Sequence, residues 1–220
     1  MPPLRICLLS GGESRRMGRD KALLPHPEGG SWLEGTLRLL ITLEAPITLL
    51  SRHNSHLQLA RQLAPAAAAL RISPVAEPPP WEGPLLALQR LSQAHPEQRL
   101  LLCPVDMPWL TRSCLQTLLA AADADPGLIH LAHDGVRRQP LLGIYPSLSP
   151  IREDLERAVA DGERRLQGWL AGQRCREVRL DPQALRNLNH HRDLPGAGIT
   201  AAADPVRHDR GTPPAAALTE

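Results

Sequence analysis

The sequence predicts an α/β protein of three layers, in which a mostly parallel sheet carries helices on both faces. Short apolar runs of strand length alternate with longer segments whose apolar residues recur at helical spacing, the pattern of successive βαβ units. The first run, residues 4–9, is almost entirely apolar, as in a strand covered on both faces. Gly11 and Gly12 follow it at once. Because ligands of such sheets bind at the carboxyl ends of the strands, this first turn is the leading candidate site.

Length and composition limit the classes of protein and partner. A chain of 220 residues corresponds to one to one and a half typical domains. Phe is absent and aromatics make up 2%, so the core must be built from Leu, Ile, Val and Ala. The formal charge of +2 is too near neutral to indicate nucleic acid or a membrane surface. With no apolar run of about 18 residues, we expect no membrane span.

The cysteines and the N-terminus predict a cytoplasmic protein. The four cysteines are scattered and form no Cys-x-x-Cys pair, so neither a zinc site nor a disulfide framework is expected. Free thiols fit a reducing compartment. The first residues contain no longer apolar region of the kind that a signal peptide needs.

The next elements follow the first glycine turn. Ser31 is a good helix N-cap, and Glu34 three residues later completes a capping box. A strand is expected at residues 46–50 and a helix near residues 54–63. Residues 71–76 form a weaker strand, because a proline inside it cannot donate to the ladder. The apolar face of the first helix consists of Leu33, Leu37, Leu40 and Ile41.

The second half continues the alternation. Pro84, at the end of a rigid proline-rich loop, suits the first turn of a helix. Residues 99–103 are the clearest strand after the first, and Thr111 caps a helix that runs to about Ala122. Strands at residues 128–132 and 139–145 are joined by a His-Asp-Gly turn. Two helices and a last strand are expected at residues 151–160, 165–171 and 175–180.

The C-terminal residues lack a folding pattern. From Pro195 onward the chain consists of Gly, Ala, Pro and charged residues without apolar periodicity. We therefore expect one domain over residues 1–194 and a disordered tail over residues 195–220.

The loop after the first strand has the chemistry of a triphosphate site. A tight glycine turn leaves backbone N–H groups free to point at an anion. The loop lacks the Gly-Lys-Ser/Thr ending of a P-loop and the glycine spacing of a dinucleotide site. The alternative is a basic surface loop that binds nothing, or binds RNA without specificity. Four cations follow the glycines within seven residues: Arg15, Arg16, Arg19 and Lys21.

Residues 9–22 resemble the nucleotidyltransferase signature Leu-x-Gly-Gly-x-Ser-x-Arg-Met-Gly-x-Asp-Lys, in the form found in the molybdenum cofactor guanylyltransferase family. Residues 104–108 resemble the Pro-x-Asp-x-Pro element of that family, whose aspartate holds the metal. A carboxylate at Asp106, directly after a strand, suits Mg²⁺, which takes one or two carboxylates with substrate phosphates and water. The alternative is that Asp106 only caps a turn or begins a loop.

Three later stretches extend the resemblance over residues 4–194. Residues 133–141 are similar to the stretch of the family that meets the acceptor side of the cleft, and residues 162–166 to its acceptor-side helix start. Residues 187–194 look like its Asn-x-Asn-Thr-Pro-Glu-Asp-Leu ending. Each alone is equally a hairpin turn, a surface helix or a polar loop, and their joint order carries the assignment.

The resemblance implies a Rossmann-like nucleotidyltransferase fold and transfer of GMP from GTP to molybdopterin, with Mg²⁺ as cofactor and release of pyrophosphate. Molybdoenzyme maturation proteins are candidate partners. It implies that Arg15, Lys21 and Asp106 are catalytic and that Asp106 is the metal ligand. The implied nucleotide-binding residues are Leu9, Ser10, Gly11, Gly12, Lys21, Glu77 and Asp106, and the implied acceptor-binding residues are Arg165, Asn187 and Asn189.

Departures from the family pattern leave undecided which nucleobase the protein selects. Leu49 stands where an asparagine for base recognition is expected, and Glu77 stands for the usual aspartate. Residues 26–30 look like a small insertion, and His190-His191 replaces Thr-Pro. A cytidylyltransferase or a sugar-phosphate nucleotidyltransferase is therefore the nearest alternative. A non-catalytic nucleotide-binding module is a third, against which the retention of both Lys21 and Asp106 argues.

Overall fold

The computed structural model describes residues 1–12, 19–26, 28–63 and 72–187, and the statements below concern these residues. The strands are β1 Leu4–Leu9, β2 Ile47–Ser51, β3 Ile72–Ala76, β4 Arg99–Pro104, β5 Ile129–His133, β6 Arg138–Pro146 and β7 Cys175–Arg179. The helices are the short 3₁₀ helix η1 Lys21–Leu23, then α1 Trp32–Ile41, α2 Asn54–Leu63, α3 Pro84–Ala94, α4 Arg112–Ala124, α5 Ile151–Ala160 and α6 Leu166–Leu170.

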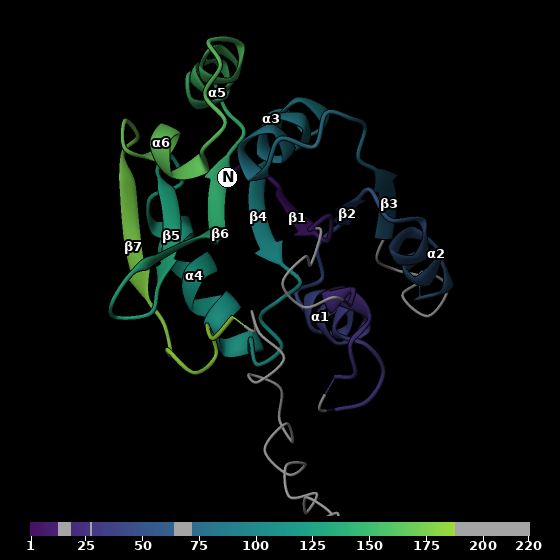
Figure 1. The fold of residues 1–220 in the computed structure, drawn as a ribbon. Helices are drawn as coiled ribbons and strands as arrows, with labels where there is room; N and C mark the ends of the chain where they lie inside the picture. The colour runs from purple at the N-terminus through teal and green to yellow at the C-terminus, as the bar shows by residue number, and fades with distance from the viewer. Residues whose placement is uncertain (13–18, 27, 64–71, 188–220) are drawn as a thin grey trace, which may run out of the picture.

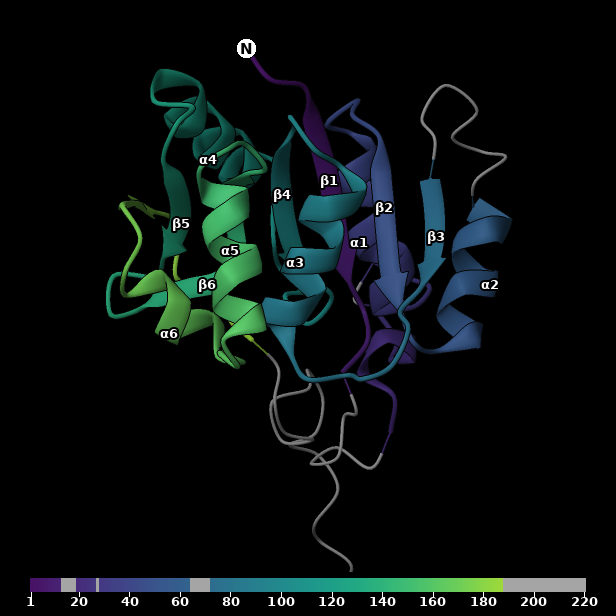
Figure 2. The same cartoon turned by 90° about the horizontal axis from the view of Figure 1, so that it is seen from above.

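The strands form one sheet in the order β3-β2-β1-β4-β6-β5-β7. β6 runs antiparallel to both of its neighbours, and the other neighbouring pairs are parallel. Helices α1, α2 and α4 cover one face, and α3, α5 and α6 cover the other (Figures 1 and 2). The predicted fold class, a three-layer and mostly parallel α/β protein, is confirmed.

Local signals in the sequence set several of these boundaries. The Ser31 hydroxyl accepts from the Glu34 N–H, while the Glu34 carboxylate accepts from the Ser31 N–H, so the predicted capping box begins α1. Thr111 caps α4 in the same way through the Cys114 N–H. Pro84 opens α3. β3, which contains a proline, lies at the edge of the sheet, where a missing donor is tolerated.

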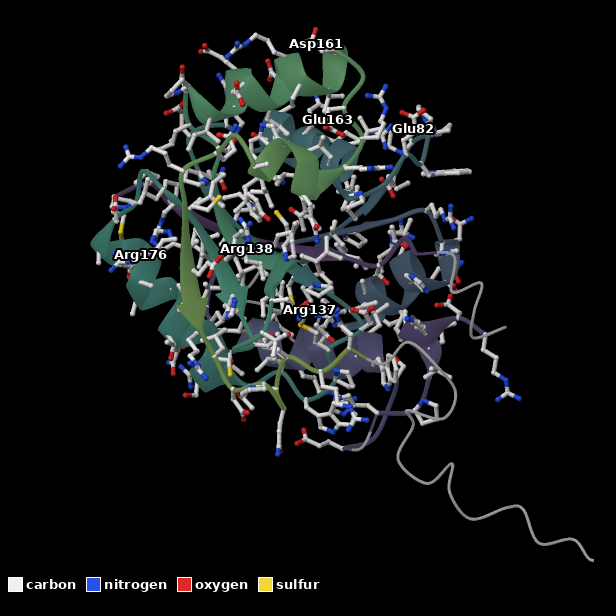
Figure 3. All side chains as sticks on the ribbon, turned by 60° about the vertical axis from the view of Figure 1, so that its left-hand side comes forward. Glu82, Arg137, Arg138, Asp161, Glu163 and Arg176 are labelled. Atoms are coloured by element: carbon white, nitrogen blue, oxygen red, sulfur yellow. The ribbon has the colours of Figure 1, made fainter. Side chains whose placement is uncertain are left out.

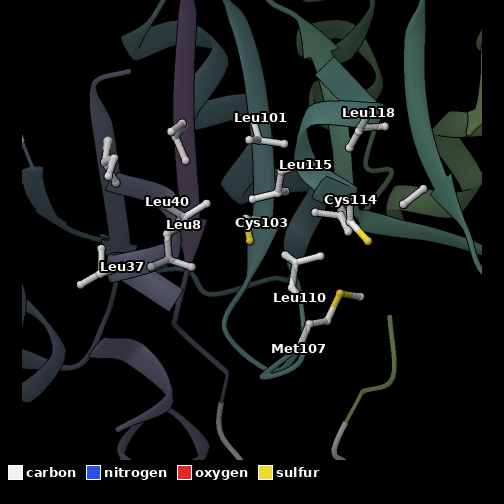
Figure 4. Packing of buried hydrophobic residues seen from close by; sticks show 14 of the residues in the cluster. Leu8, Leu37, Leu40, Leu101, Cys103, Met107, Leu110, Cys114, Leu115 and Leu118 are labelled. Atoms are coloured by element: carbon white, nitrogen blue, oxygen red, sulfur yellow. The ribbon is translucent and has the colours of Figure 1, made fainter. Parts of the chain in front are cut away.

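The core is aliphatic, as the composition requires. On one face, Leu37 and Leu40 of α1 pack toward Leu8 of β1, and Leu115 of α4 packs toward Leu101 of β4 (Figure 4). These five side chains are fully buried. A separate apolar layer packs the helices onto each face of the sheet. The strand ends are therefore held rigidly with respect to one another.

One edge of the sheet collects the candidate residues. The carboxyl ends of six strands and the start of the antiparallel β6 meet there. Along this edge lie Gly11 after β1, Arg52 after β2, Glu77 after β3 and Asp106 after β4. No helix among the described residues is long and apolar enough to span a bilayer. The domain boundary after Leu194 and the tail expected at residues 195–220 lie outside the described residues.

Candidate functional site

A cavity of about 490 Å³ opens at this edge of the sheet. It joins the ends of β1, β2, β3 and β4 to the first turn of α3. Polar groups at its wall come from the glycine turn, the 3₁₀ helix and the loops after β2, β3 and β4. The residues that line it include Leu9, Ser10, Gly11, Gly12, Asp20, Lys21, Arg52, His56, Glu77, Trp81 and Asp106.

At Gly11 the glycine turn packs closely against the Glu77 side chain. A Cβ on Gly11 would lie 2.9 Å from the Glu77 carboxylate, too close for any other residue without displacing that side chain. Near Gly12, no atom lies within 4 Å of a Cβ added there, so its backbone stands open to the cavity. Ser10 fixes the turn, since its N–H donates to the Leu50 carbonyl and its own carbonyl accepts from the Ser51 hydroxyl. The backbone can therefore approach a ligand closely.

Lys21 is positioned by the residue before it. The Asp20 carboxylate accepts from the Ala22 N–H at 3.1 Å and thereby caps the 3₁₀ helix η1, which sequence patterns did not predict. This cap orients Lys21 toward the cavity, where its Nζ lies 3.8 Å from the Asp106 Oδ2. Two residues 85 positions apart in the chain thus face each other, as the two motifs of the sequence implied.

Asp106 has the environment of a cation ligand. Burial raises the pKa of the Asp106 carboxyl, and the nearby Lys21 ammonium partly opposes this rise. A divalent cation beside this carboxyl would favour its ionised form. The described residues contain no group of three or more His, Cys, Asp or Glu side chains that could hold a metal. Mg²⁺ normally takes one or two carboxylates and completes its shell with phosphates and water, so the donor set fits it.

His56 is a site residue that the sequence reasoning missed. This side chain from α2 is 1% exposed, and its Nδ1 lies 2.7 Å from the Ser10 carbonyl oxygen. On the opposite side of the ring, Nε2 lies 2.7 Å from the Asp20 Oδ2. The histidine therefore ties the cap of η1 to the end of β1. A signal was available, because a helix that follows a parallel strand begins at the ligand-binding edge.

Leu49 does not reach the cavity. It is fully buried in the core and is not among the residues that line the cavity. Arg52, three residues later, lies beyond the strand end and lines the cavity. A base contact from the Leu49 position is therefore not part of this cavity, while Arg52 is placed to face a ligand there. Because both faces of β2 are covered, its sequence has no alternation that marks where the strand ends.

The end of the cavity next to β3 is built around Glu77. Its N–H donates to the Ser51 carbonyl, and its Oε1 accepts from Arg90 at 3.3 Å. Burial raises the pKa of the Glu77 carboxyl, while Arg90 and Arg52 oppose the rise. A half-buried acceptor at this end suits a ligand that presents N–H donors.

The hairpin between β5 and β6 lies at the same edge of the sheet. The Asp134 carboxylate accepts from the Val136 and Arg137 N–H groups, which lowers the pKa of Asp134 to about 2 and closes the turn. Leu141 of β6 lines the first cavity. A second cavity of about 370 Å³ adjoins the hairpin and is lined by His133, Val136, Arg137, Arg138, Pro140, Gln167, Leu170 and Glu177.

The predicted acceptor residues lie apart from the first cavity lining. Arg165 precedes α6, and its N–H donates to the Glu163 carboxylate at 2.8 Å. The same turn contacts the loop after β3 through an ion pair between Arg164 and Glu82, and Glu82 and Glu163 lie near each other in Figure 3. The Oδ1 atom of Asn187 is buried without a hydrogen-bond partner in the part of the chain that the structure describes.

The sequence-predicted residues therefore divide into three groups. Arg15 and Asn189 lie outside the described residues. Arg165 and Asn187 do not line the first cavity. The structure brings together at that cavity Leu9, Ser10, Gly11, Gly12, Lys21, Glu77 and Asp106.

Comparison with known families gives one match over most of the chain. Residues 6–182 match the model of the MobA-like NTP transferase domain. A protein of Rhodopirellula baltica named "Probable molybdenum cofactor guanylyltransferase" is 38% identical over 88% of this chain and 90% of its own length. A Mycobacterium bovis protein of the same name is 31% identical over 93% of this chain and 96% of its own length.

Solved structures share the fold. Molybdopterin-guanine dinucleotide biosynthesis protein A from Archaeoglobus fulgidus superposes with a TM-score of 0.62 at 18% identity, covering 86% of this chain and 94% of that one. The 4-diphosphocytidyl-2C-methyl-D-erythritol synthase of Anaerococcus prevotii gives 0.68 at 12% identity, covering 87% and 92%. At these identities, the comparison concerns the fold alone.

Proposed function

Because this chain belongs to the MobA-like NTP transferase family, we propose that it transfers GMP from GTP to molybdopterin and releases pyrophosphate. Relatives with the name molybdenum cofactor guanylyltransferase, 31–38% identical over most of the chain, support this substrate pair. The structural observation that carries the proposal is the facing pair of Lys21 and Asp106 beside an open glycine turn. A binding module would not need a carboxylate placed against the phosphate-binding lysine.

The reaction needs positioning and charge neutralisation more than proton transfer. A terminal phosphate oxygen of the acceptor attacks the α-phosphorus of GTP in line, and the bond to the bridging oxygen of pyrophosphate breaks. The attacking oxygen is already ionised near neutral pH, since the second pKa of a phosphate monoester is about 6. The site therefore requires no general base. Its contribution comes from holding both phosphates in place and from balancing the charge that develops on the leaving group.

Each residue has a part in that task. The backbone of residues 9–12 holds the nucleotide, and the Lys21 ammonium balances the negative charge of the departing pyrophosphate. Arg15, from the same motif, is proposed to assist Lys21. The Glu77 carboxylate accepts from the N–H donors of the base. A guanine offers two such donors on its pairing edge, which favours GTP at this end of the cavity.

Asp106 is proposed as the protein ligand of Mg²⁺. The bound ion would supply charge to the phosphate oxygens of the nucleotide. Asp106 itself holds a carboxylate at the edge of the sheet next to Lys21, at a fixed position after the buried strand β4. Burial raises the pKa of this carboxyl, and the Lys21 ammonium opposes part of that rise.

The domain, compartment and partner assignments belong to the same proposal. Residues 1–194 are proposed to form the nucleotidyltransferase domain, and residues 195–220 a C-terminal tail. The four cysteines are free thiols, which supports a reducing cytoplasm. Molybdoenzyme maturation proteins are proposed to take up the product.

Pyrophosphate release tests the function directly. With molybdopterin and magnesium, GTP is expected to give the highest rate, and CTP and ATP are expected to give much lower rates, because Glu77 accepts hydrogen bonds that guanine donates. The measurement is pyrophosphate formed per enzyme for each nucleotide, with and without molybdopterin. A preference for CTP would move the protein to the cytidylyl branch with its chemistry intact. Tight GTP binding without any pyrophosphate release would instead identify a non-catalytic nucleotide-binding module.

The acceptor side gives a second test. Arg165→Ala is expected to raise the KM for molybdopterin roughly tenfold or more, the effect of losing one hydrogen bond to a charged group, and to leave GTP affinity unchanged. Arg157→Ala is the matched control, since Arg157 is an exposed arginine of α5 that pairs with Asp154 within its own helix. If the variant at Arg165 weakened GTP binding as much as molybdopterin use, Arg165 would belong to the nucleotide site or to the fold.

A further inference from the structure

Trp81 is a half-exposed indole in a chain with few aromatic residues. Its side chain is 51% exposed, whereas Trp32 and Trp169 are 1% and 5% exposed. It lies in the loop between β3 and α3 and lines the first cavity. Burial in the core therefore does not explain this tryptophan.

The loop holds the indole in a fixed position. The Trp81 Nε1 donates to the Glu77 carbonyl at 3.0 Å. On one side of it, the Pro80 carbonyl accepts from the Arg90 guanidinium at 3.1 Å, and on the other, Glu82 pairs with Arg164. The same Arg90 also binds the Glu77 carboxylate. A side chain restrained on both sides loses little entropy when a ligand packs against it.

Arg52 lies over one face of the indole and forms a stacked pair with it. The Arg52 Cζ lies 5.3 Å from the centroid of the Trp81 ring, a cation–π contact. Both residues line the first cavity beside Glu77. Indole and guanidinium planes are the two protein surfaces on which nucleobases stack most readily.

The order of the strands fixes which part of a nucleotide reaches this surface. Asp106 follows β4 and Gly12 follows β1, so the phosphates lie over these two strands. Arg52 follows β2 and Glu77 follows β3, on the opposite side of β1 from β4. A nucleoside triphosphate that spans the cavity from Lys21 therefore brings its base to the end where the indole lies.

We propose that Trp81, supported by Arg52, is the stacking surface for the nucleobase. This inference rests on the proposed function and deepens it by adding a base contact that the family motifs do not include. Stacking supplies affinity for any base, because every base has a π-face, while the Glu77 carboxylate supplies selectivity through hydrogen bonds. The two roles are separable by experiment.

The test compares two ligands that share the phosphates and differ in the base. GTP and inorganic tripolyphosphate are titrated, each with magnesium, against the wild-type chain, Trp81→Ala and Trp81→Phe. Trp81→Ala is expected to weaken GTP binding roughly 5- to 150-fold, the range for the loss of one base–aromatic stack. Tripolyphosphate affinity is expected to stay unchanged. Trp81→Phe retains an aromatic face and is expected to recover most of the GTP affinity.

The chain offers a matched control in a second tryptophan–arginine pair. The Arg186 Cζ lies 5.7 Å from the centroid of the Trp109 ring, and Trp109 does not line the first cavity. Trp109→Ala, assayed below its melting temperature, is expected to leave the affinity for both ligands unchanged. An indole–guanidinium pair away from the cavity thus separates a specific base contact from a general loss of aromatic packing.

The other results distinguish failure of the stacking role from failure of the proposed function. Equal loss of GTP and tripolyphosphate affinity in Trp81→Ala would show that the indole shapes the loop and does not touch the base. Unchanged GTP affinity would show that Trp81 has no contact with the nucleotide. If the wild-type chain bound GTP no more tightly than tripolyphosphate, the guanosine would add no affinity and the proposed function itself would be ruled out. If CTP bound better than GTP and the loss in Trp81→Ala persisted, the stacking role would stand and the choice of base would be revised.

Discussion

Asp106→Asn is expected to lower turnover by roughly two orders of magnitude or more, the scale of losing one electrostatic stabiliser in an active site. The substitution keeps the size of the side chain and removes its charge. Without the carboxylate the proposed magnesium ion loses its protein ligand, while the glycine turn and Lys21 stay in place. The measurement is pyrophosphate release from GTP and molybdopterin as a function of magnesium concentration, and excess magnesium is expected to restore part of the activity.

The fold should survive this change, which makes the kinetic result interpretable. Because burial raises the pKa of Asp106, the folded state disfavours its ionised form, and above that pKa the charge adds no stability that could be lost. The thermal midpoint of Asp106→Asn at neutral pH should therefore match that of the wild type within a few degrees. A well-folded variant with near-normal turnover would leave Asp106 as a turn residue after β4 and end its assignment as a metal ligand.

Lys21→Ala is expected to cause a loss of similar size by a different route. The Lys21 side chain is 16% exposed and its ammonium group faces the Asp106 carboxylate, so the charge acts in a partly desolvated site where it is weakly screened. Its removal weakens the hold on the triphosphate and leaves the charge of the departing pyrophosphate poorly balanced. We expect turnover to fall roughly 100-fold and the KM for GTP to rise. Excess magnesium should not restore this variant, in contrast to Asp106→Asn.

Arg19→Ala is the matched control for the lysine. Arg19 belongs to the same basic motif, is exposed and does not line the first cavity. Arg19→Ala removes one positive charge two residues before Lys21, so an effect of net charge on nucleotide binding would appear in both Arg19→Ala and Lys21→Ala. Comparable losses in Arg19→Ala and Lys21→Ala would mean that the loop attracts the nucleotide by charge alone, and Lys21 would no longer be assigned to the leaving group.

The type and order of the elements could be predicted from the sequence, because the signals that set them are local. The capping box of Ser31 and Glu34, the Thr111 cap and Pro84 at a helix start involve residues within one turn of each other, and each was found as predicted. The pairing of a glycine turn with Lys21 and Asp106 also followed from the sequence. General rules of parallel sheets place both motifs at the carboxyl ends of strands, where the structure has them.

Contacts between distant segments were decided by the tertiary structure. His56 has no motif, yet it joins Asp20 to the Ser10 carbonyl across 36 and 46 residues of chain. Leu49 stands where the family has an asparagine for base recognition, but Arg52 is the residue that lines the cavity, since a strand buried on both faces gives no alternation to mark its end. The reversal of β6 and the support of Trp81 by Arg90 and Arg164 likewise depend on segments that meet only after folding. The motifs in the sequence therefore determined which chemical groups lie at the edge of the sheet. The packing of helices on both faces determined which of these side chains share one cavity, because the distances between side chains of distant segments are set by non-local contacts.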